Sequence, residues 1–292
     1  PKNGRSLHPI ERLRMVARAQ GEDPALVARE AAEVLADCAG DPAALVTGCR
    51  RLVDHQPTSG PIWWLAARVL SAADPEEEAW RSADLLAGDA TPGALGYHLP
   101  EDTTVLVVGW PDQASEALRR RGDCRVLVVD DISTGGGLAR WLRRAGSDAL
   151  VVEHAGMGPA AAASGLVLLE ATALGAAGDG EAGFVAAAGS RAAAAVARSA
   201  GVPVWVVAGV GRVLPGPLWQ AMVGRLEAGT DPWDRPDEVV PLALADQVVG
   251  PGGPFPAAEA PARADCPSVP ELTRTVAMPG SRPRGGAEPH HG

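Results

Sequence analysis

The sequence predicts an α/β protein: an N-terminal helical bundle, then a Rossmann-like parallel sheet domain, then a disordered C-terminal tail. Between residues 102 and 214, short β-branched runs alternate with Ala- and Arg-rich segments, and each run is almost continuously apolar. Such runs are typical of parallel strands that helices bury on both faces. Before residue 100 the dipeptide Asp-Pro recurs three times, which indicates helix starts. We therefore expect three parts, at 1–100, 101–250 and 251–292.

The first part is predicted to contain four helices. Asp-Pro occurs at 23–24, 41–42 and 74–75. An Asp at this position accepts hydrogen bonds from the free amides of the first turn, and a Pro at the first helical position has no amide to lose. The apolar residues of 25–35 fall at helical spacing, so these helices have a face to bury. The predicted helices span 24–38, 42–55, 61–72 and 75–87.

The second part alternates predicted strands and helices. The strands are expected at 104–108, 125–129, 149–152, 165–169 and 202–208. The helices between them are expected at 113–121, 137–145, 160–164 and 190–200. Gly201 directly follows the last helix, at the position where glycine commonly ends a helix, and the next strand begins at residue 202.

The third part is predicted to be a tail. Residues 251–292 hold nine prolines and six glycines in 42 positions, with few large apolar groups. Such a segment buries too little surface to offset the entropy of ordering it.

Composition excludes several classes of partner. The net charge of −10 argues against nucleic acid, whose phosphates require clustered Lys and Arg. Four scattered cysteines without a CxxC pair predict a reduced cytoplasmic protein with no metal site. With no apolar run of about 20 residues, we expect no membrane segment. We also expect no cofactor.

Two turns after predicted strands carry polar groups. Glu153-His154 follows the strand at 149–152, at the end where open α/β sheets bind ligands, and could serve in acid/base catalysis. The alternative is a solvated loop pair. Asp130-Asp131 precedes a Gly-rich helix start that could bind an anion or a ribose; the alternative is a capping Asp and a loose turn. Trp110, after Gly109, could stack on a ligand ring or cover the helix that follows it.

Three segments resemble one known family. They are HQPTSGPIWWLAAR at 55–68, the run from GLVLLEATALG to VPVWVVA at 165–208, and EVVPLALADQVVGPGG at 238–253. They are similar, in the same order, to segments of methylthioribose-1-phosphate isomerase. That family includes ribose-1,5-bisphosphate isomerase and the alpha, beta and delta regulatory subunits of initiation factor 2B. The resemblance implies a helical bundle ahead of the sheet and a homodimer formed through the α/β domain. The Ala/Val-rich segments 160–174 and 182–198 also favour a dimer.

The family's functional residues can be carried over one by one. Its catalytic Cys corresponds to Gly109 or Trp110, and its general-acid Asp to Glu153, a carboxylate one methylene longer. The substrate-contacting Asp corresponds to Thr172. Its Asn-Lys pair corresponds to Ala186-Ala187, whereas the following Gly-Thr is kept as Gly189-Ser190.

The phosphate-contacting Arg of the family corresponds to Gln56. Isomerisation requires proton donors and acceptors as well as groups fixed on the phosphate. We therefore predict a non-catalytic relative, a pseudoenzyme that acts in assembly or in sensing a phosphorylated metabolite. The alternative is an aldose-ketose isomerase on a phosphorylated sugar or nucleoside, with Glu153 and His154 as catalytic residues. The candidate ligand-binding residues are Gly109, Trp110, Asp130, Asp131, Thr172, Gly189 and Ser190.

Overall fold

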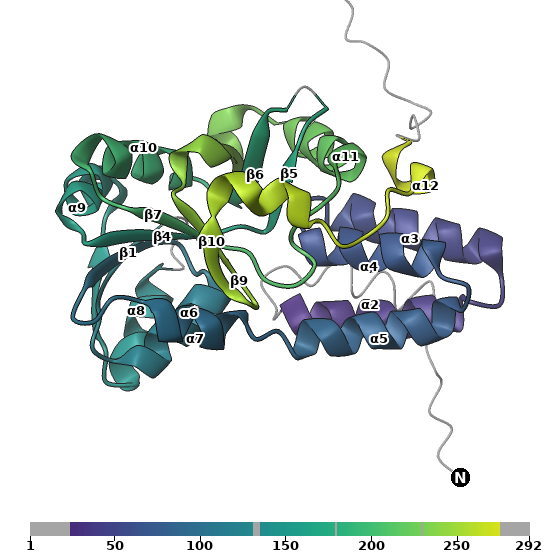
Figure 1. Cartoon of the computed structure of the whole chain (residues 1–292), viewed down its shortest axis with the longest axis horizontal. Helices are drawn as coiled ribbons and strands as arrows, with labels where there is room; N and C mark the ends of the chain where they lie inside the picture. Colours follow the sequence, from purple (N-terminus) through teal and green to yellow (C-terminus); the bar gives the residue numbers. More distant parts are fainter. Residues whose placement is uncertain (1–23, 131–134, 179, 229, 275–292) are drawn as a thin grey trace, which may run out of the picture.

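The computed structural model describes residues 24–130, 135–178, 180–228 and 230–274. Helices at one end of the molecule form a bundle, and a large sheet flanked by helices forms the other end (Figure 1). The α/β fold class predicted from the sequence, with helices first and a parallel sheet after them, is confirmed. Among the described residues, no helix is long and apolar enough to cross a membrane.

The bundle contains the four predicted helices. They are α2 (Pro24–Asp37), α3 (Pro42–His55), α4 (Gly60–Ser71) and α5 (Pro75–Ala87). Asp41 accepts hydrogen bonds from the amides of Ala43 and Ala44, and Asp74 accepts one from Glu77, so the side chains cap these helices as predicted.

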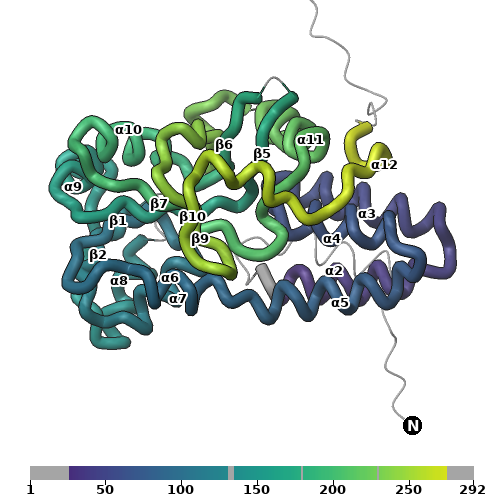
Figure 2. The backbone as a smooth tube through the Cα atoms, in the orientation of Figure 1, coloured from purple at the N-terminus to yellow at the C-terminus, as the bar shows by residue number. Residues whose placement is uncertain are grey.

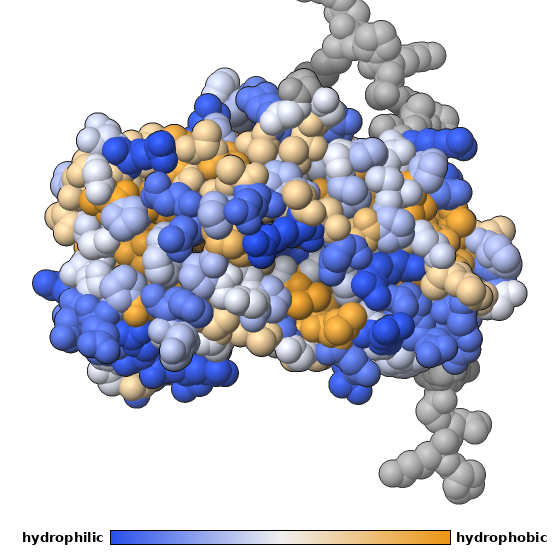
Figure 3. Space-filling model, viewed as in Figure 1, coloured by the Kyte–Doolittle hydropathy of each residue, from blue (hydrophilic) through white to orange (hydrophobic). Residues whose placement is uncertain are grey.

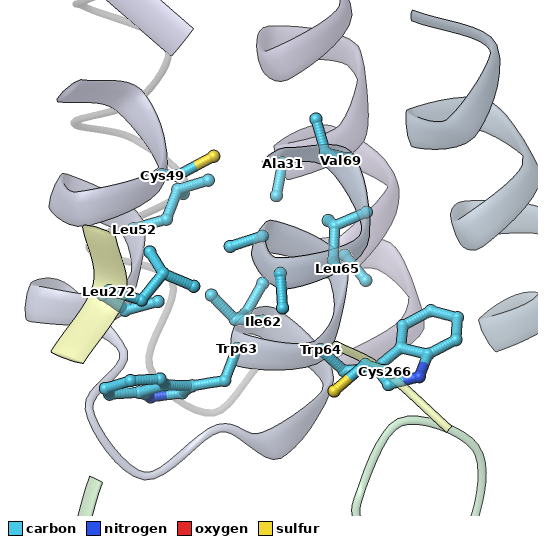
Figure 4. Packing of buried hydrophobic residues seen from close by; sticks show 14 of the residues in the cluster. Ala31, Cys49, Leu52, Ile62, Trp63, Trp64, Leu65, Val69, Cys266 and Leu272 are labelled. Carbon is cyan, nitrogen blue, oxygen red and sulfur yellow. The ribbon is translucent and has the colours of Figure 1, made fainter. Parts of the chain in front are cut away.

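Helix α4 lies at the centre of the bundle and is apolar on nearly every side. Trp63 and Trp64 are completely buried, and Figure 4 shows them beneath Ile62 and Leu65. Each indole N–H has a partner: Trp63 donates to the Pro57 carbonyl at 3.1 Å, and Trp64 donates to Asp265 at 2.7 Å. The pair is therefore core, as a buried indole with a satisfied N–H should be.

The main sheet has seven strands in the order β10-β9-β7-β4-β1-β2-β3. All adjacent pairs are parallel except β9 and β10. Figure 2 shows β9 and β10 nearest the bundle and β1 and β2 farthest from it. The strands are β1 (Thr104–Val108), β2 (Arg125–Val129), β3 (Asp148–Val152), β4 (Leu166–Glu170), β7 (Val204–Val207), β9 (Gln247–Gly250) and β10 (Gly253–Pro256).

Helices cover both faces of this sheet. Apolar residues of α9 (Met157–Ala163) and α10 (Ser190–Ala200) pack on one face, with Leu106 and Val167. Those of α6 (Thr91–His98), α7 (Asp112–Arg121) and α8 (Gly135–Arg144) pack on the other, with Val105 and Val107. This two-sided burial explains why the strands read as continuous apolar runs.

A second, antiparallel sheet was not predicted. Its strands are β5 (Ala173–Ala176), β6 (Ala182–Ala187) and β8 (Asp237–Pro241), and α11 (Gly216–Glu227) packs on it. Strands β5 and β6 read ALGA and AGFVAA, so they lack the β-branched residues that mark a strand in sequence. Glycine is required there because a Cβ at Gly175 would fall 2.6 Å from the Cβ of Trp219.

The predicted tail from residue 251 onward is wrong over 251–274. This stretch forms β10, the 3-10 helix η4 (Ala257–Arg263) and the short helix α12 (Pro270–Thr273). Val269 and Leu272 are buried in the core of the bundle, so a few apolar side chains are enough when the core they enter is already formed (Figure 4). Residues 275–292 lie outside the described part of the chain.

Candidate functional site at the carboxyl edge of the sheet

The chain reverses its direction of travel across the sheet between β1 and β4. Strands β2 and β3 add on one side of β1, whereas β4, β7 and β9 add on the other. In open α/β sheets, ligands bind at such a point, outside the carboxyl ends of the strands. The predicted site residues follow β1, β2, β3 and β4 or precede α10, so the fold brings them to this edge; Asp131 lies outside the described residues.

His154, Asp130 and Gly189 come together above the end of β1. His154 lies in the 3-10 helix η1 (His154–Gly156), and its Nδ1 is 2.6 Å from the carbonyl oxygen of Asp130. Because a carbonyl only accepts, Nδ1 carries the proton, and a neutral ring leaves Nε2 as the acceptor. A Cβ on Gly189 would lie 3.3 Å from Nε2 and 3.9 Å from Val108. Gly189 adopts φ +97°, which favours glycine, so the α10 start can approach the imidazole closely.

The other predicted residues have structural surroundings. Trp110 is 41% exposed; its ring lies 6.1 Å from that of Trp141 on α8 and leaves no room for a Cβ at Gly137. It therefore packs on α8, whereas the sequence placed it over α7, the helix that directly follows it.

Thr172 links the sheet to the bundle. Its amide donates to the Val185 carbonyl at 2.8 Å, and its own carbonyl accepts from Gly60 at the start of α4 at 3.0 Å. Glu153 is exposed, and Ser190 is buried at 2% exposure.

Carboxylates from the chain itself occupy three helix N-termini at this edge. Glu170 accepts from the Ala114 amide of α7 at 3.0 Å. Asp130 accepts from the Gly135 amide of α8 at 3.0 Å. Glu238, on β8, accepts from the amides of Gly189 and Arg191 at 2.8 and 3.0 Å, at the start of α10. These amides and the helix dipole would otherwise attract a phosphate.

The carboxylate at α7 is held in a buried ion pair. Glu170 and Arg212 approach to 2.9 Å, with side chains 8% and 7% exposed, and Arg212 also donates to the Ala171 carbonyl at 2.6 Å. Glu170 thus has both a cation and an amide as partners, and Arg212 has a carboxylate and a carbonyl. The positive charge of Arg212 is therefore neutralised within the chain.

A second polar cluster lies beside the pair and was not predicted. Asp89 accepts from the Gln113 side chain at 2.6 Å and from the Val210 amide at 2.8 Å. Gly209 has no room for a Cβ, because both side chains lie directly against it. The sequence signal was an Asp two residues before the Thr-Pro that opens α6, which indicates only a cap.

The cysteine thiols lie elsewhere. Cys124 precedes β2, at the amino end of the sheet, whereas Cys49 and Cys266 belong to the bundle core and Cys38 packs against it. Burial raises the pKa of all four, to about 12 for Cys266. The described residues contain no cluster of three or more His, Cys, Asp or Glu that could hold a metal ion.

The arrangement has the fold of known proteins. A translation initiation factor eIF-2B from Pyrococcus horikoshii OT3 superposes with a TM-score of 0.68 at 15% identity, covering 85% of this chain and 96% of that one. The fold is that of eIF2B subunits. The eIF2B beta subunit from Chaetomium thermophilum gives a TM-score of 0.67 at 16% identity, over 86% of this chain and 89% of that one.

A chain of the tetrameric eIF2B-beta2-delta2 complex from C. thermophilum gives a TM-score of 0.68 at 17% identity, over 87% and 92% of the two chains. No protein-family model and no curated protein matches the sequence. The eIF2B-like fold therefore persists here at very low sequence identity.

Proposed function

We propose that this chain is a non-catalytic relative of the eIF2B regulatory subunits and of the sugar-phosphate isomerases that resemble them, and that it acts through assembly. The observation that carries the proposal is the set of carboxylates Glu170, Asp130 and Glu238 on the helix N-termini of the carboxyl edge. They stand where a substrate phosphate would find free amides.

The negative charge of these carboxylates disfavours the binding of a phosphate. Two like unit charges about 4 Å apart repel by about 4 kcal/mol at an effective dielectric constant of about 20. A phosphate approaching Gly189 would meet the Glu238 carboxylate on the amides it needs. Together with the absence of a thiol among the residues after β1, 109–112, this supports a site that has lost the family reaction.

A titration tests the proposal. Calorimetry with inorganic phosphate and ribose 5-phosphate should show no saturable heat for the parent protein at ligand concentrations of about 10 mM. Glu238→Ala frees two amides and should bind phosphate, whereas the matched control Glu238→Gln keeps an acceptor on them and should not. Saturable binding to the parent would instead favour a sensor of a phosphorylated metabolite and contradict a closed site.

A second candidate is a divergent isomerase acting on a phosphorylated sugar or nucleoside. The hydrogen bond that His154 Nδ1 donates to the Asp130 carbonyl favours it, because the fixed tautomer leaves Nε2, on the side of Gly189, as a proton acceptor. Glu153 would then serve as the acid. Turnover that disappears in His154→Gln would establish this candidate over the first.

Assembly as a homodimer completes the proposal. The Ala/Val-rich segments 160–174 and 182–198 support the dimer less than the sequence suggested. They form β4, β6 and much of α10, and their large apolar residues are buried in the core of the chain. We therefore place the proposed dimer surface elsewhere on the α/β domain. Light scattering should give about 60 kDa, twice the 29.9 kDa of the chain.

A further inference from the structure

Strand β3 is a free edge of the main sheet. It ends the strand order, and within the described residues it pairs with β2 alone. Two large apolar side chains are exposed on it, Leu150 at 39% and Val151 at 43%. Edge strands of this kind are usually blunted by charges, prolines or bulges, because their open backbone groups invite another strand. On the face drawn in Figure 3, apolar residues gather in small patches among hydrophilic ones.

The hydrogen bonds to β2 fix which backbone groups face outward. The Asp130 amide donates to the Val152 carbonyl at 3.1 Å, so Leu150 and Val152 direct their backbone groups to β2. Because the pattern alternates along a strand, Ala149 and Val151 direct theirs away from the sheet. The Arg143 guanidinium donates to the outward Ala149 carbonyl at 3.0 Å. The N–H and C=O of Val151 are left as the open docking point.

We infer that a second copy of this chain adds to β3 in antiparallel orientation, with the two-fold axis at Val151. The inference rests on the proposed function, since it names the surface through which the proposed dimer forms. In this register Val151 faces Val151 of the partner subunit in a hydrogen-bonded pair. Leu150 faces Val152 of the partner subunit, so both exposed apolar residues are covered. The two seven-stranded sheets become one continuous sheet.

Charge complementarity selects a second copy as the occupant and Val151 as the axis. The register places Ala149 opposite Glu153 of the partner subunit. The Arg143 guanidinium donates to the Ala149 carbonyl, so in this register it lies next to the Glu153 carboxylate of the partner subunit. The two-fold axis forms this ion pair twice. Glu153 has extended backbone, with φ −65° and ψ 152°, and can continue the strand. An axis at Leu150 would instead put Ser147 opposite Glu153 and leave Arg143 without an acid.

Light scattering of the full chain tests the inference first. The parent should be a dimer, and Val151→Pro should be a monomer. The Val151 N–H points outward, so proline removes no hydrogen bond within the chain and is tolerated at an edge. Val151→Thr, which keeps the β-branched shape and the N–H, is the matched control and should remain a dimer. Circular dichroism confirms that each variant folds.

Disulfide trapping provides a second measurement that does not depend on the proline variant. A hydrogen-bonded antiparallel pair has Cα atoms about 5.5 Å apart, within the range of about 4.4–6.8 Å for a disulfide. Val151→Cys should therefore form a covalent dimer on mild oxidation. Leu150→Cys is the control, because the two copies of residue 150 are offset by two positions and lie roughly 8 Å apart.

The outcomes separate this inference from the proposal beneath it. A parent dimer that survives Val151→Pro and gives no Val151→Cys cross-link would overturn the β3 surface and leave the dimer intact. A parent monomer at about 100 µM would overturn both. A dimer that is lost in Val151→Pro, or is cross-linked by Val151→Cys and not by Leu150→Cys, supports β3 as the dimer surface. The phosphate titration tests separately whether the carboxyl edge binds a phosphate.

Discussion

Glu170 and Arg212 form a buried ion pair, 2.9 Å apart, at the point where the sheet reverses its direction of growth. Glu170 also accepts a hydrogen bond from the Ala114 amide at the start of α7. One carboxylate thus caps a helix and neutralises a buried cation. Interactions within the chain therefore hold the carboxyl edge together.

Arg212→Met should destabilise the protein strongly. The substitution leaves Glu170 buried without its cation, and breaking a buried pair in this way typically costs about 3–5 kcal/mol. Urea unfolding measures the loss. Arg125→Met is the control, because the Arg125–Asp148 pair is 55% and 64% exposed at 3.4 Å and should contribute less than about 1 kcal/mol. Equal effects of the two variants would show that the buried pair is not structurally important.

Two glycine substitutions should change stability in opposite directions. Gly209→Ala forces a Cβ into the side chains of Asp89 and Gln113 and should cost about 1–3 kcal/mol by overpacking. Gly224→Ala lies inside α11 with open space around it and should stabilise by about 0.5–1 kcal/mol through helix propensity. Thermal unfolding measures both changes. A Gly209→Ala variant as stable as the parent would show that the side chains of Asp89 and Gln113 can move to make room for the Cβ.

The sequence predicted the parts of the fold that are marked by local signals. Strands 104–108 and 125–129 and helix 190–200 were placed at their observed bounds, because continuous β-branched runs and a Gly after a helix are local features. The second sheet was missed because β5 and β6 consist mainly of Ala and Gly. Composition also misled for 251–274, where Leu272 enters a core built by distant helices.

The site was only partly accessible to sequence reasoning. Glu153, His154, Asp130 and Gly189 were expected at the carboxyl edge because they follow strands or precede a helix, and they lie there. The capping roles of Glu170 and Glu238 could not be predicted. Their amide partners lie 56 and 49 residues away in the chain, so only the folded topology brings them together.

Acid should weaken the protein partly through Asp123. Its hydrogen bonds from Arg121 lower the pKa of Asp123 to about 2 from 3.8. A lowered pKa in the folded state gives stability that is present above pH 3.8 and is lost as the pH falls toward 2. Because the carboxylate is 30% exposed, we expect less than about 1 kcal/mol. Asp123→Asn should reduce the change of unfolding free energy with pH over this interval. An unchanged pH dependence would show that Asp123 does not contribute to acid unfolding.

Native thiols should react slowly with a disulfide reagent at pH 8. Burial raises the pKa of Cys49 and Cys266, so little thiolate forms at either. Cys38 is only half-buried and should react first, and Cys38→Ser should remove that fast phase. A fast phase that persists in Cys38→Ser would place a reactive thiol where the packing excludes one.

The most direct test of a carboxyl edge closed to the family reaction is an isomerase assay with methylthioribose 1-phosphate and ribose 1,5-bisphosphate. A positioned acid or base typically contributes about 10²–10⁴-fold. The resemblance to the isomerases aligns their catalytic Cys with Gly109 or Trp110, neither of which carries a thiol. We predict conversion at the background rate for the parent protein, unchanged in Glu153→Gln. Robust turnover by the parent that is abolished in Glu153→Gln would contradict the account and establish an enzyme.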